Sequence, residues 1–445
     1  MDRAMQSYFK WSDWIIGFLC LLRFCDSLNN GLALTPPMGW MSWQRYRCNV
    51  DCYNYPNDCL SEMLIKRIAD LMVSEGYKDA GYEYLIIDDC WLNKTRGRNG
   101  ELLEDAERFP SGMKNLSNYI HGKGLKFGIY QDFGNFTCAG YPGLFGHLEQ
   151  DAQTFADWDV DYIKVDTCYS YDNLEELEDG YSNFGQMLNK TGRQMVYSCS
   201  WPAYFELSSN KKPNYDILKQ VCNLWRNYGD IEDDWSDVLD ILDWFAANQE
   251  RFASYAGPGQ WNDPDMLLLG NYGLSYEQSK SQMVLWAILA APLLMSADLA
   301  EIRPEIKDIL QNKDIIEINQ DALGIQGTLI LTKVNINVWM KPIQPVVDDS
   351  QSYAVAFLGR MKGGYPYRLV ISLNELQINS SESYMVTNIL DPYKEGNVVL
   401  SKDEFVSVTV KPSGVVLLKF VPVEENKNLL YSKRIDEDFL IPDFQ

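Results

Sequence analysis

Six short apolar runs in this chain of 445 residues each end on a carboxylate or on another polar side chain of a type that enzymes use. An unpaired charge is costly inside a buried strand, so these side chains are expected at strand ends. If the strands are parallel, their carboxyl ends converge on one mouth, where a (β/α)8 barrel holds its active site. The pattern therefore predicts an enzyme that relies on carboxylates. The runs cover residues 85–89, 126–132, 162–166, 196–200, 224–230 and 261–265.

The elements that would position these acids alternate between strand-like and helical patterns. Apolar residues recur at helical spacing within 61–75, and 151–158 and 236–248 follow the same pattern. With 38–40 as the first strand and 292–296 as the last, the chain offers eight strands. Strands that alternate with helices imply a parallel sheet. We therefore predict an α/β fold, a TIM barrel that occupies residues 28–325.

The chain changes character after about residue 326. Runs rich in β-forming residues are separated by turn residues, at 338–341, 353–357, 367–372 and 414–420. This pattern predicts an antiparallel β-sandwich over residues 326–445, with a loosely held polar tail beyond Asn426.

The first 27 residues fit a cleaved signal peptide. Lys10 precedes an apolar stretch at 14–22, and Cys25 and Ser27 supply small residues before the cleavage site. The segment predicts entry into the secretory pathway, and hence a lysosomal or a secreted protein.

Cysteines and sequons agree with that route. Eight cysteines lie outside the signal, an even number that predicts disulfides. Five sequons offer sites for glycosylation, at Asn93, Asn115, Asn135, Asn189 and Asn379. The apolar segment 283–297 is divided by Pro292, so we interpret it as a buried helix and a strand rather than a membrane span.

The composition narrows the chemistry further. A net charge of −23 argues against nucleic acid or an anionic membrane as a partner. Only two histidines are present, His121 and His147, and neither a zinc-protease motif nor a phosphate loop occurs. Proton transfer is then left to carboxylates or tyrosines, and no metal or cofactor is expected. Two carboxyl groups, one as nucleophile and one as acid/base, are the usual equipment for cleaving a glycosidic bond.

Four longer motifs carry a resemblance to a known family. They are MGWMSW at 38–43, YLIIDDCW at 84–91, YIKVDTC at 162–168 and AGPGQWNDPDM at 256–266. They resemble glycoside hydrolase family 27, which contains α-galactosidases and α-N-acetylgalactosaminidases. The resemblance extends from about residue 28 to 321 and implies a retaining glycosidase that forms a homodimer.

By this resemblance Asp166 is the nucleophile and Asp230 the general acid/base. Lys164 lies two residues before Asp166 and is expected to keep it ionised. Acids near Asp230 are expected to raise its pKa, which predicts an acidic pH optimum. In a retaining enzyme the two carboxyl groups lie about 5–5.5 Å apart. From residue types alone, Asp166 could equally cap a helix and Asp230 could be an ordinary loop acid.

The resemblance also assigns the side chains that bind the sugar. Adjacent acids, Asp88 and Asp89, would accept hydrogen bonds from sugar hydroxyls. Another acid with an arginine would hold the side of the 2-substituent, and two aromatic rings would face the apolar side of the sugar. These are Asp265 with Arg226, and Trp43 with Tyr130. Without the motifs, core packing explains both rings equally well.

Substrate choice depends on the loop CSWPAY at 199–204. In the family, galactose-selective members carry Glu and Leu where Ser200 and Ala203 stand, whereas members that act on N-acetylgalactosamine carry Ser and Ala. An acetamido group needs volume, a donor for its carbonyl and an apolar wall for its methyl group. Ser200 would supply the donor, and Ala203 and Tyr204 the space and the wall.

The resemblance pairs all eight cysteines, and it also exposes departures. The implied disulfides are Cys48–Cys90, Cys52–Cys59, Cys138–Cys168 and Cys199–Cys222. Thr167 follows the nucleophile where the family usually has glycine, and a β-branched residue would be strained there if φ were positive. Gln131 stands where a small residue is usual, and Asp321-Ala322 replaces Asp-Pro.

Taken together, the sequence predicts a retaining exo-α-N-acetylgalactosaminidase that acts on glycolipids and glycoproteins. The rival within the family is an α-galactosidase. The rival from another class is a carbohydrate-binding homologue that has lost catalysis.

Overall fold

The computed structural model describes residues 30–423, apart from 171–172, 209–210, 379–382, 392–396 and 402–403. The expected signal peptide, the sequon at Asn379 and the polar tail lie outside the described residues.

The first part of the chain forms an eight-stranded parallel sheet in the order β7-β6-β5-β4-β3-β2-β1-β8. A parallel bridge between Leu267 and Met295 joins the segment after β7 to β8 and closes the sheet into a barrel. The TIM-barrel prediction is therefore confirmed. The strands are β1 Met38–Met41, β2 Tyr84–Ile87, β3 Lys126–Asp132, β4 Tyr162–Asp166, β5 Val196–Cys199, β6 Leu224–Arg226, β7 Trp261–Asp263 and β8 Leu293–Met295.

Helices surround this barrel, and their starts follow local sequence rules. In α3 (Glu62–Ser74) the Ser61 side chain caps the helix by accepting a hydrogen bond from the Leu64 amide. A capping box formed by Ser275 and Gln278 starts α10. The others are α2 Trp43–Tyr46, α4 Met113–Gly122, α5 Leu148–Asp157, α6 Leu174–Lys190, α7 Trp201–Ser208, α8 Tyr215–Val221, α9 Trp235–Phe252, α10 Tyr276–Ile288, α11 Pro304–Leu310 and α12 Lys313–Asn319, with a 3-10 turn η1 at Ala253–Tyr255.

Helix α10 is apolar because it is enclosed by protein. It contacts α11, α12 and three strands of the C-terminal domain, and its residues 281–288 are all buried. Among the described residues, no helix combines the length and apolar character that crossing a membrane requires.

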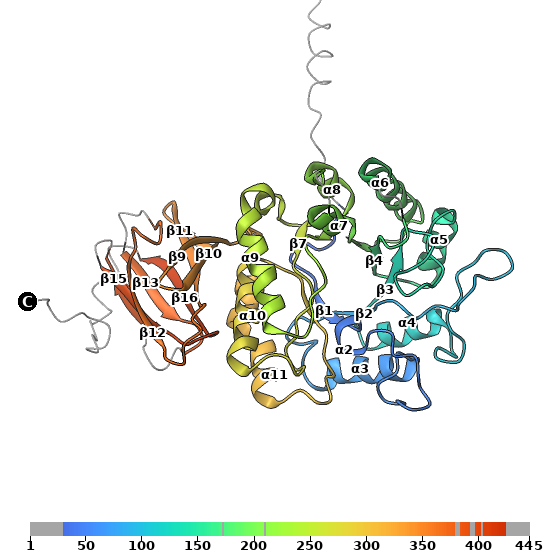
Figure 1. Cartoon of the computed structure of the whole chain (residues 1–445), viewed down its shortest axis with the longest axis horizontal. Helices are drawn as coiled ribbons and strands as arrows, with labels where there is room; N and C mark the ends of the chain where they lie inside the picture. Colours follow the sequence, from blue (N-terminus) through green and yellow to red (C-terminus); the bar gives the residue numbers. More distant parts are fainter. Residues whose placement is uncertain are drawn as a thin grey trace, which may run out of the picture.

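The C-terminal domain packs beside α9 and α10, as Figure 1 shows. A six-stranded antiparallel sheet and a two-stranded ribbon enclose a second apolar core, which confirms the β-sandwich prediction. The six strands are β9 Thr328–Lys333, β10 Ile336–Val347, β11 Ser350–Gly359, β13 Ser383–Asn388, β14 Asn397–Leu400 and β16 Val415–Val423, and the ribbon is β12 Tyr367–Ser372 with β15 Phe405–Val410.

Candidate active site

The carboxyl ends of the barrel strands bring the candidate acids together. Asp132 and Asp166 are the last residues of β3 and β4, and the register places them side by side. Asp88 and Asp89 directly follow β2, and Asp265 follows β7 by two residues. Acids that are far apart in the sequence thus share one end of the barrel, where such folds hold their chemistry.

Asp166 is held by hydroxyl groups on both of its oxygens. The Tyr204 hydroxyl donates to Oδ1 at 2.8 Å, and the Tyr130 hydroxyl donates to Oδ2 at 3.2 Å. The Thr167 amide donates to Oδ1 at 2.9 Å. Three neutral donors therefore fix the orientation of this carboxylate, as an attacking group requires.

Lys164 has a different direct partner from the one that the sequence suggested. Its Nζ lies 2.8 Å from Oδ2 of Asp88, and both side chains are buried. Asp166 acts on the ammonium group only as a further nearby charge. Burial raises the pKa of Asp88, and Lys164 opposes that rise. Lys164 thus holds the sugar-binding acid Asp88 in place and adds positive potential near Asp166.

Asp89 is buried without a cationic partner in contact. Its oxygens accept hydrogen bonds from the amides of Ala139, at 2.9 Å, and Cys90, at 2.6 Å. Burial raises the pKa of Asp89 to about 6.

Arg226 connects the expected acid/base to the acid on the other side of the pocket. Its guanidinium lies 3.2 Å from Oδ1 of Asp230 and 3.0 Å from Oδ2 of Asp265. Partial desolvation raises the pKa of Asp230, but the charges of Arg226 and Lys164 outweigh it and the pKa falls below its usual value. The expectation of a raised pKa was therefore wrong. Cations, and not the neighbouring acids, dominate at this position.

The specificity loop begins at the end of β5 and enters α7. Ser200 is 4% exposed, and its Oγ finds no hydrogen-bond partner among the described residues. Ala203 is buried at 7% exposure, and the Tyr204 ring beside it is 37% exposed. A buried hydroxyl without a partner is costly, so Ser200 is suited to bonding a bound ligand.

Trp43 opens α2 directly after β1 and packs against the barrel core while remaining partly exposed. The Ser42 hydroxyl beside it accepts a hydrogen bond from the Asp88 amide at 2.9 Å. Trp43 therefore lies next to the sugar-binding acids.

The residues that depart from the family pattern are accommodated without strain at Thr167. Its φ is not in the left-handed region, so the expected strain is absent there. Its Oγ1 lies 2.7 Å from the buried Tyr181 hydroxyl. Gln131 is fully buried and donates to the Pro142 carbonyl at 3.2 Å. Asp321 accepts a hydrogen bond from the Gln344 amide at 2.8 Å.

Four disulfides clamp the site region, and their pairs are those that the resemblance implied: Cys48–Cys90, Cys52–Cys59, Cys138–Cys168 and Cys199–Cys222. Cys168 lies two residues after the nucleophile, so the third bridge restrains the β4 tip. The sequon residues Asn115, Asn135 and Asn189 are exposed, and Asn93 is partly buried.

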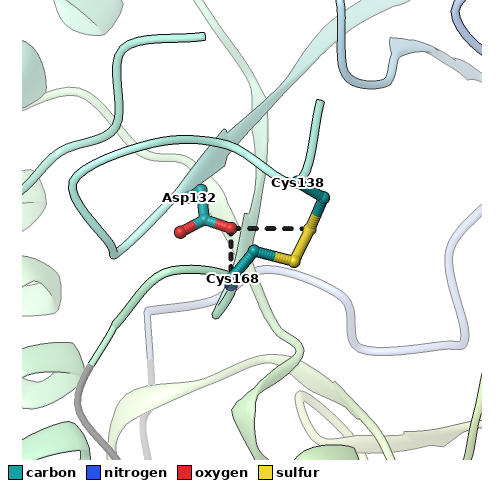
Figure 2. Close-up of side chains that lie close together, drawn as sticks. All are labelled: Asp132, Cys138 and Cys168. Carbon is teal, nitrogen blue, oxygen red and sulfur yellow. Dashed lines mark hydrogen bonds between the residues drawn. A yellow bond between two sulfur atoms is a disulfide. The ribbon is translucent and has the colours of Figure 1, made fainter. Parts of the chain in front are cut away.

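One acid in the site was missed as a functional candidate, although it ends one of the six runs. Asp132 is fully buried and accepts hydrogen bonds from the amides of Gly134, at 2.7 Å, and Cys168, at 2.8 Å. Figure 2 shows its carboxyl group beside the disulfide, with Oδ2 at 3.7 Å from Sγ of Cys138. Burial and the charge of Asp166 raise the pKa of Asp132 to about 9.

The proton on Asp132 has a place to point. A disulfide sulfur carries no hydrogen and cannot be a thiolate ligand, so the contact with Cys138 can be a hydrogen bond only if the carboxyl group donates. Asp263 is a second missed acid, also buried, and burial raises its pKa to about 6. Both acids follow apolar strand residues, but only contacts across strands reveal their environment.

These raised pKa values predict that the protein is more stable at acidic pH. A carboxyl group normally titrates near pH 4 in an unfolded chain. Asp89, Asp132 and Asp263 hold protons in the folded state up to about pH 6, 9 and 6. The folded state therefore binds more protons, and stability falls as the pH rises through these values. We expect the melting temperature to drop by roughly 5 °C or more between pH 5 and pH 8, measured by calorimetry.

The matched variants are Asp132→Asn and Asp159→Asn. The amide does not titrate, so Asp132→Asn should reduce the difference between the two melting temperatures. Hydrogen bonding to Lys114 lowers the pKa of the exposed Asp159, so its variant should keep the full difference between pH 5 and pH 8. A melting temperature that is constant or higher at pH 8 in the wild type would contradict the prediction.

Comparison with known proteins gives a consistent result. A family model described as Alpha galactosidase A matches residues 35–321, and one described as Alpha galactosidase A C-terminal beta sandwich domain matches residues 324–414. The chain is 49% identical to human Alpha-galactosidase A over 88% of this chain and 90% of that protein. It is 48% identical to Alpha-N-acetylgalactosaminidase of Gallus gallus over 89% and 95%. Among solved structures, alpha-galactosidase I of Mortierella vinacea has a TM-score of 0.77 at 31% identity and covers 88% of this chain and 98% of that one.

Proposed function

The chain belongs to the alpha galactosidase A family of glycoside hydrolases, and from this premise we propose that it removes terminal α-linked N-acetylgalactosamine from glycolipids and glycoproteins. Nearly equal identity to a galactosidase and to an N-acetylgalactosaminidase leaves the substrate undecided. The loop at 199–204 supports the amino sugar, because small residues there leave room for an acetamido group.

The observation that carries this proposal is the unpartnered hydroxyl of Ser200. It is buried and has no hydrogen-bond partner within the described part of the chain. A carbonyl oxygen of an acetamido group would accept its proton and relieve the cost of leaving it unbonded. The methyl group of Ala203 and the ring of Tyr204 would then contact the acetyl methyl group. A glutamate at position 200 would occupy the same volume.

In the proposed reaction Asp166 attacks the anomeric carbon while Asp230 gives its proton to the departing oxygen. The carbon–oxygen bond to the aglycone breaks, and an ester forms between Asp166 and the sugar. Water then attacks the anomeric carbon, Asp230 takes a proton from it, and Asp166 leaves as a carboxylate. The α configuration is retained after two inversions.

The lowered pKa of Asp230 supports an acidic optimum for this reaction. The side chain must hold a proton to act as an acid, and with its pKa below the usual value it does so only at low pH. An acidic compartment such as the lysosome agrees with this requirement and with the signal peptide expected at residues 1–27. A secreted form and a homodimer are further parts of the proposal, which relatives of this family suggest.

The proposal predicts a clear preference between two chromogenic substrates. With 4-nitrophenyl α-N-acetylgalactosaminide, kcat/KM should exceed that for 4-nitrophenyl α-galactoside by about tenfold or more, because a hydroxyl at C2 leaves the Ser200 pocket unfilled. Both substrates share one leaving group, so the ratio reports only the sugar. A higher kcat/KM on the galactoside would reject the N-acetylgalactosaminidase assignment and favour the α-galactosidase.

A further inference from the structure

Two large aromatic side chains remain exposed on the loops that follow β3 and β4. Phe136 is 51% exposed, and Tyr169 is 63% exposed. Their rings pack edge to face, with centroids 6.2 Å apart and an interplanar angle of 87°. An exposed aromatic pair loses much of the stabilisation that burial would give, so its position calls for an explanation from function.

The backbone is built to present this pair. The Asn135 amide donates to the Tyr169 carbonyl at 3.3 Å. Gly134 approaches so closely that an added Cβ would lie 2.0 Å from the Cys168 carbonyl oxygen, a distance that only glycine allows. Tyr169 itself has φ of 49°, in the left-handed region that bulky residues avoid. Such strain is commonly found at binding and catalytic sites.

The pair lies next to the groups that would break the glycosidic bond. Tyr169 follows Cys168, and Phe136 precedes Cys138 by two residues, so the rings flank the ends of one disulfide. Sγ of Cys138 lies 3.6 Å from Oδ2 of Asp166. Sγ of Cys168 lies 3.3 Å from the Tyr204 hydroxyl, which bonds the same carboxylate.

A third exposed apolar side chain borders the expected acid/base. Leu207 in α7 is 53% exposed, and its Cδ1 would lie 3.6 Å from a methyl group added at Gly229, the residue before Asp230. Asp230 protonates the oxygen of the leaving group in the proposed reaction. Apolar surface thus lies near both acids that act on the scissile bond.

We infer that Phe136 and Tyr169 form an aglycone platform, which binds the pyranose ring that carries the departing oxygen. This inference rests on the proposed function. In a glycan the unit one bond beyond the cleaved sugar is a pyranose, whose face of C–H groups suits an aromatic ring. A lipid chain would begin at least one sugar farther out. A peptide backbone would call for hydrogen-bond partners, whereas the platform presents two uncharged rings.

The test compares two substrates with the same terminal sugar. One is N-acetylgalactosamine α-linked to galactose, and the other is methyl α-N-acetylgalactosaminide, which lacks an aglycone ring. We expect Phe136→Ala and Tyr169→Ala each to lower kcat/KM on the disaccharide about five- to tenfold, with less than a twofold effect on the methyl glycoside. Tyr169→Phe and Phe136→Tyr should restore the disaccharide rate, because each keeps the ring.

Tyr365→Ala is the matched control. Tyr365 is 60% exposed and stacks on Tyr367 with centroids 5.0 Å apart, but this pair belongs to the C-terminal domain. Its loss should leave both substrates within twofold of wild type. The sequon at Asn135 requires a second control, Asn135→Gln. If the difference between wild type and Phe136→Ala disappears without that glycan, the ring packs on the protein's own sugar and the platform is wrong.

The remaining outcomes separate the platform from the proposed function. Equal losses on both substrates would overturn the platform, because the rings would then only support the nucleophile loop. A loss confined to N-acetylgalactosamine linked to a serine or threonine peptide would replace the pyranose by a peptide and also overturn it. If the wild type cleaves only galactosides, the substrate proposal fails. The ratio of galactosyl disaccharide to methyl galactoside then tests the platform by itself.

Discussion

Asp166→Asn is expected to lower kcat by at least about 10³-fold while the protein still folds and binds its sugar. The amide carries no negative charge and cannot form the glycosyl ester. Its carbonyl oxygen can still accept a hydrogen bond from the hydroxyl of Tyr204 or Tyr130, which hold Asp166 at 2.8 and 3.2 Å. The affinity for N-acetylgalactosamine, measured by calorimetry, should stay within about tenfold of wild type, a difference of ~1.4 kcal/mol.

A chemical rescue distinguishes the two acids. In Asp166→Gly, azide can enter from the face where the carboxylate stood, and the product should be the β-glycosyl azide. In Asp230→Gly, azide instead attacks the glycosyl ester on Asp166, and the product should be the α-glycosyl azide. The control is Asp157→Asn, an exposed acid at the end of α5, which should keep wild-type activity. Unchanged turnover in Asp166→Asn would remove this residue from its role, and an inactive wild type that binds sugar would favour the carbohydrate-binding alternative.

The double variant Ser200→Glu with Ala203→Leu is expected to invert the preference between the two sugars. The larger side chains fill the space for the acetamido group, and the glutamate offers an acceptor to the hydroxyl at C2. Each lost or gained contact set changes the transition-state free energy by about 1–3 kcal/mol, so the ratio of kcat/KM values should shift by about 10²–10⁴ toward the galactoside. The 4-nitrophenyl substrates measure this ratio directly.

Single variants show which part of the loop is responsible. Ser200→Ala removes only the hydroxyl and should lower kcat/KM on the N-acetylgalactosaminide by about tenfold, with little effect on the galactoside. Ala203→Leu alone should clash with the acetyl methyl group. If the double variant keeps the wild-type preference with intact folding, the volume of this loop does not select the substrate.

The sequence alone determined the architecture and the residue types at the strand ends. Alternating strand and helix patterns predicted the barrel, and β9 begins at Thr328, two residues after the predicted boundary. The motifs around Asp88, Asp166 and Asp265 placed the acids on their strands, because strand identity depends on local patterns that a single sequence contains. Ser200 and Ala203 could also be read from the sequence, since their small size is a property of the residue type.

Only the tertiary structure decided how those residues behave. Lys164 bonds Asp88, Arg226 lowers the pKa of Asp230, and burial raises that of Asp132. Each result depends on distances between side chains from different strands and on the water that packing excludes. The exposure of Phe136 likewise depends on how two loops meet. Such through-space effects combine charge, burial and backbone geometry, and the order of residues along the chain does not fix them.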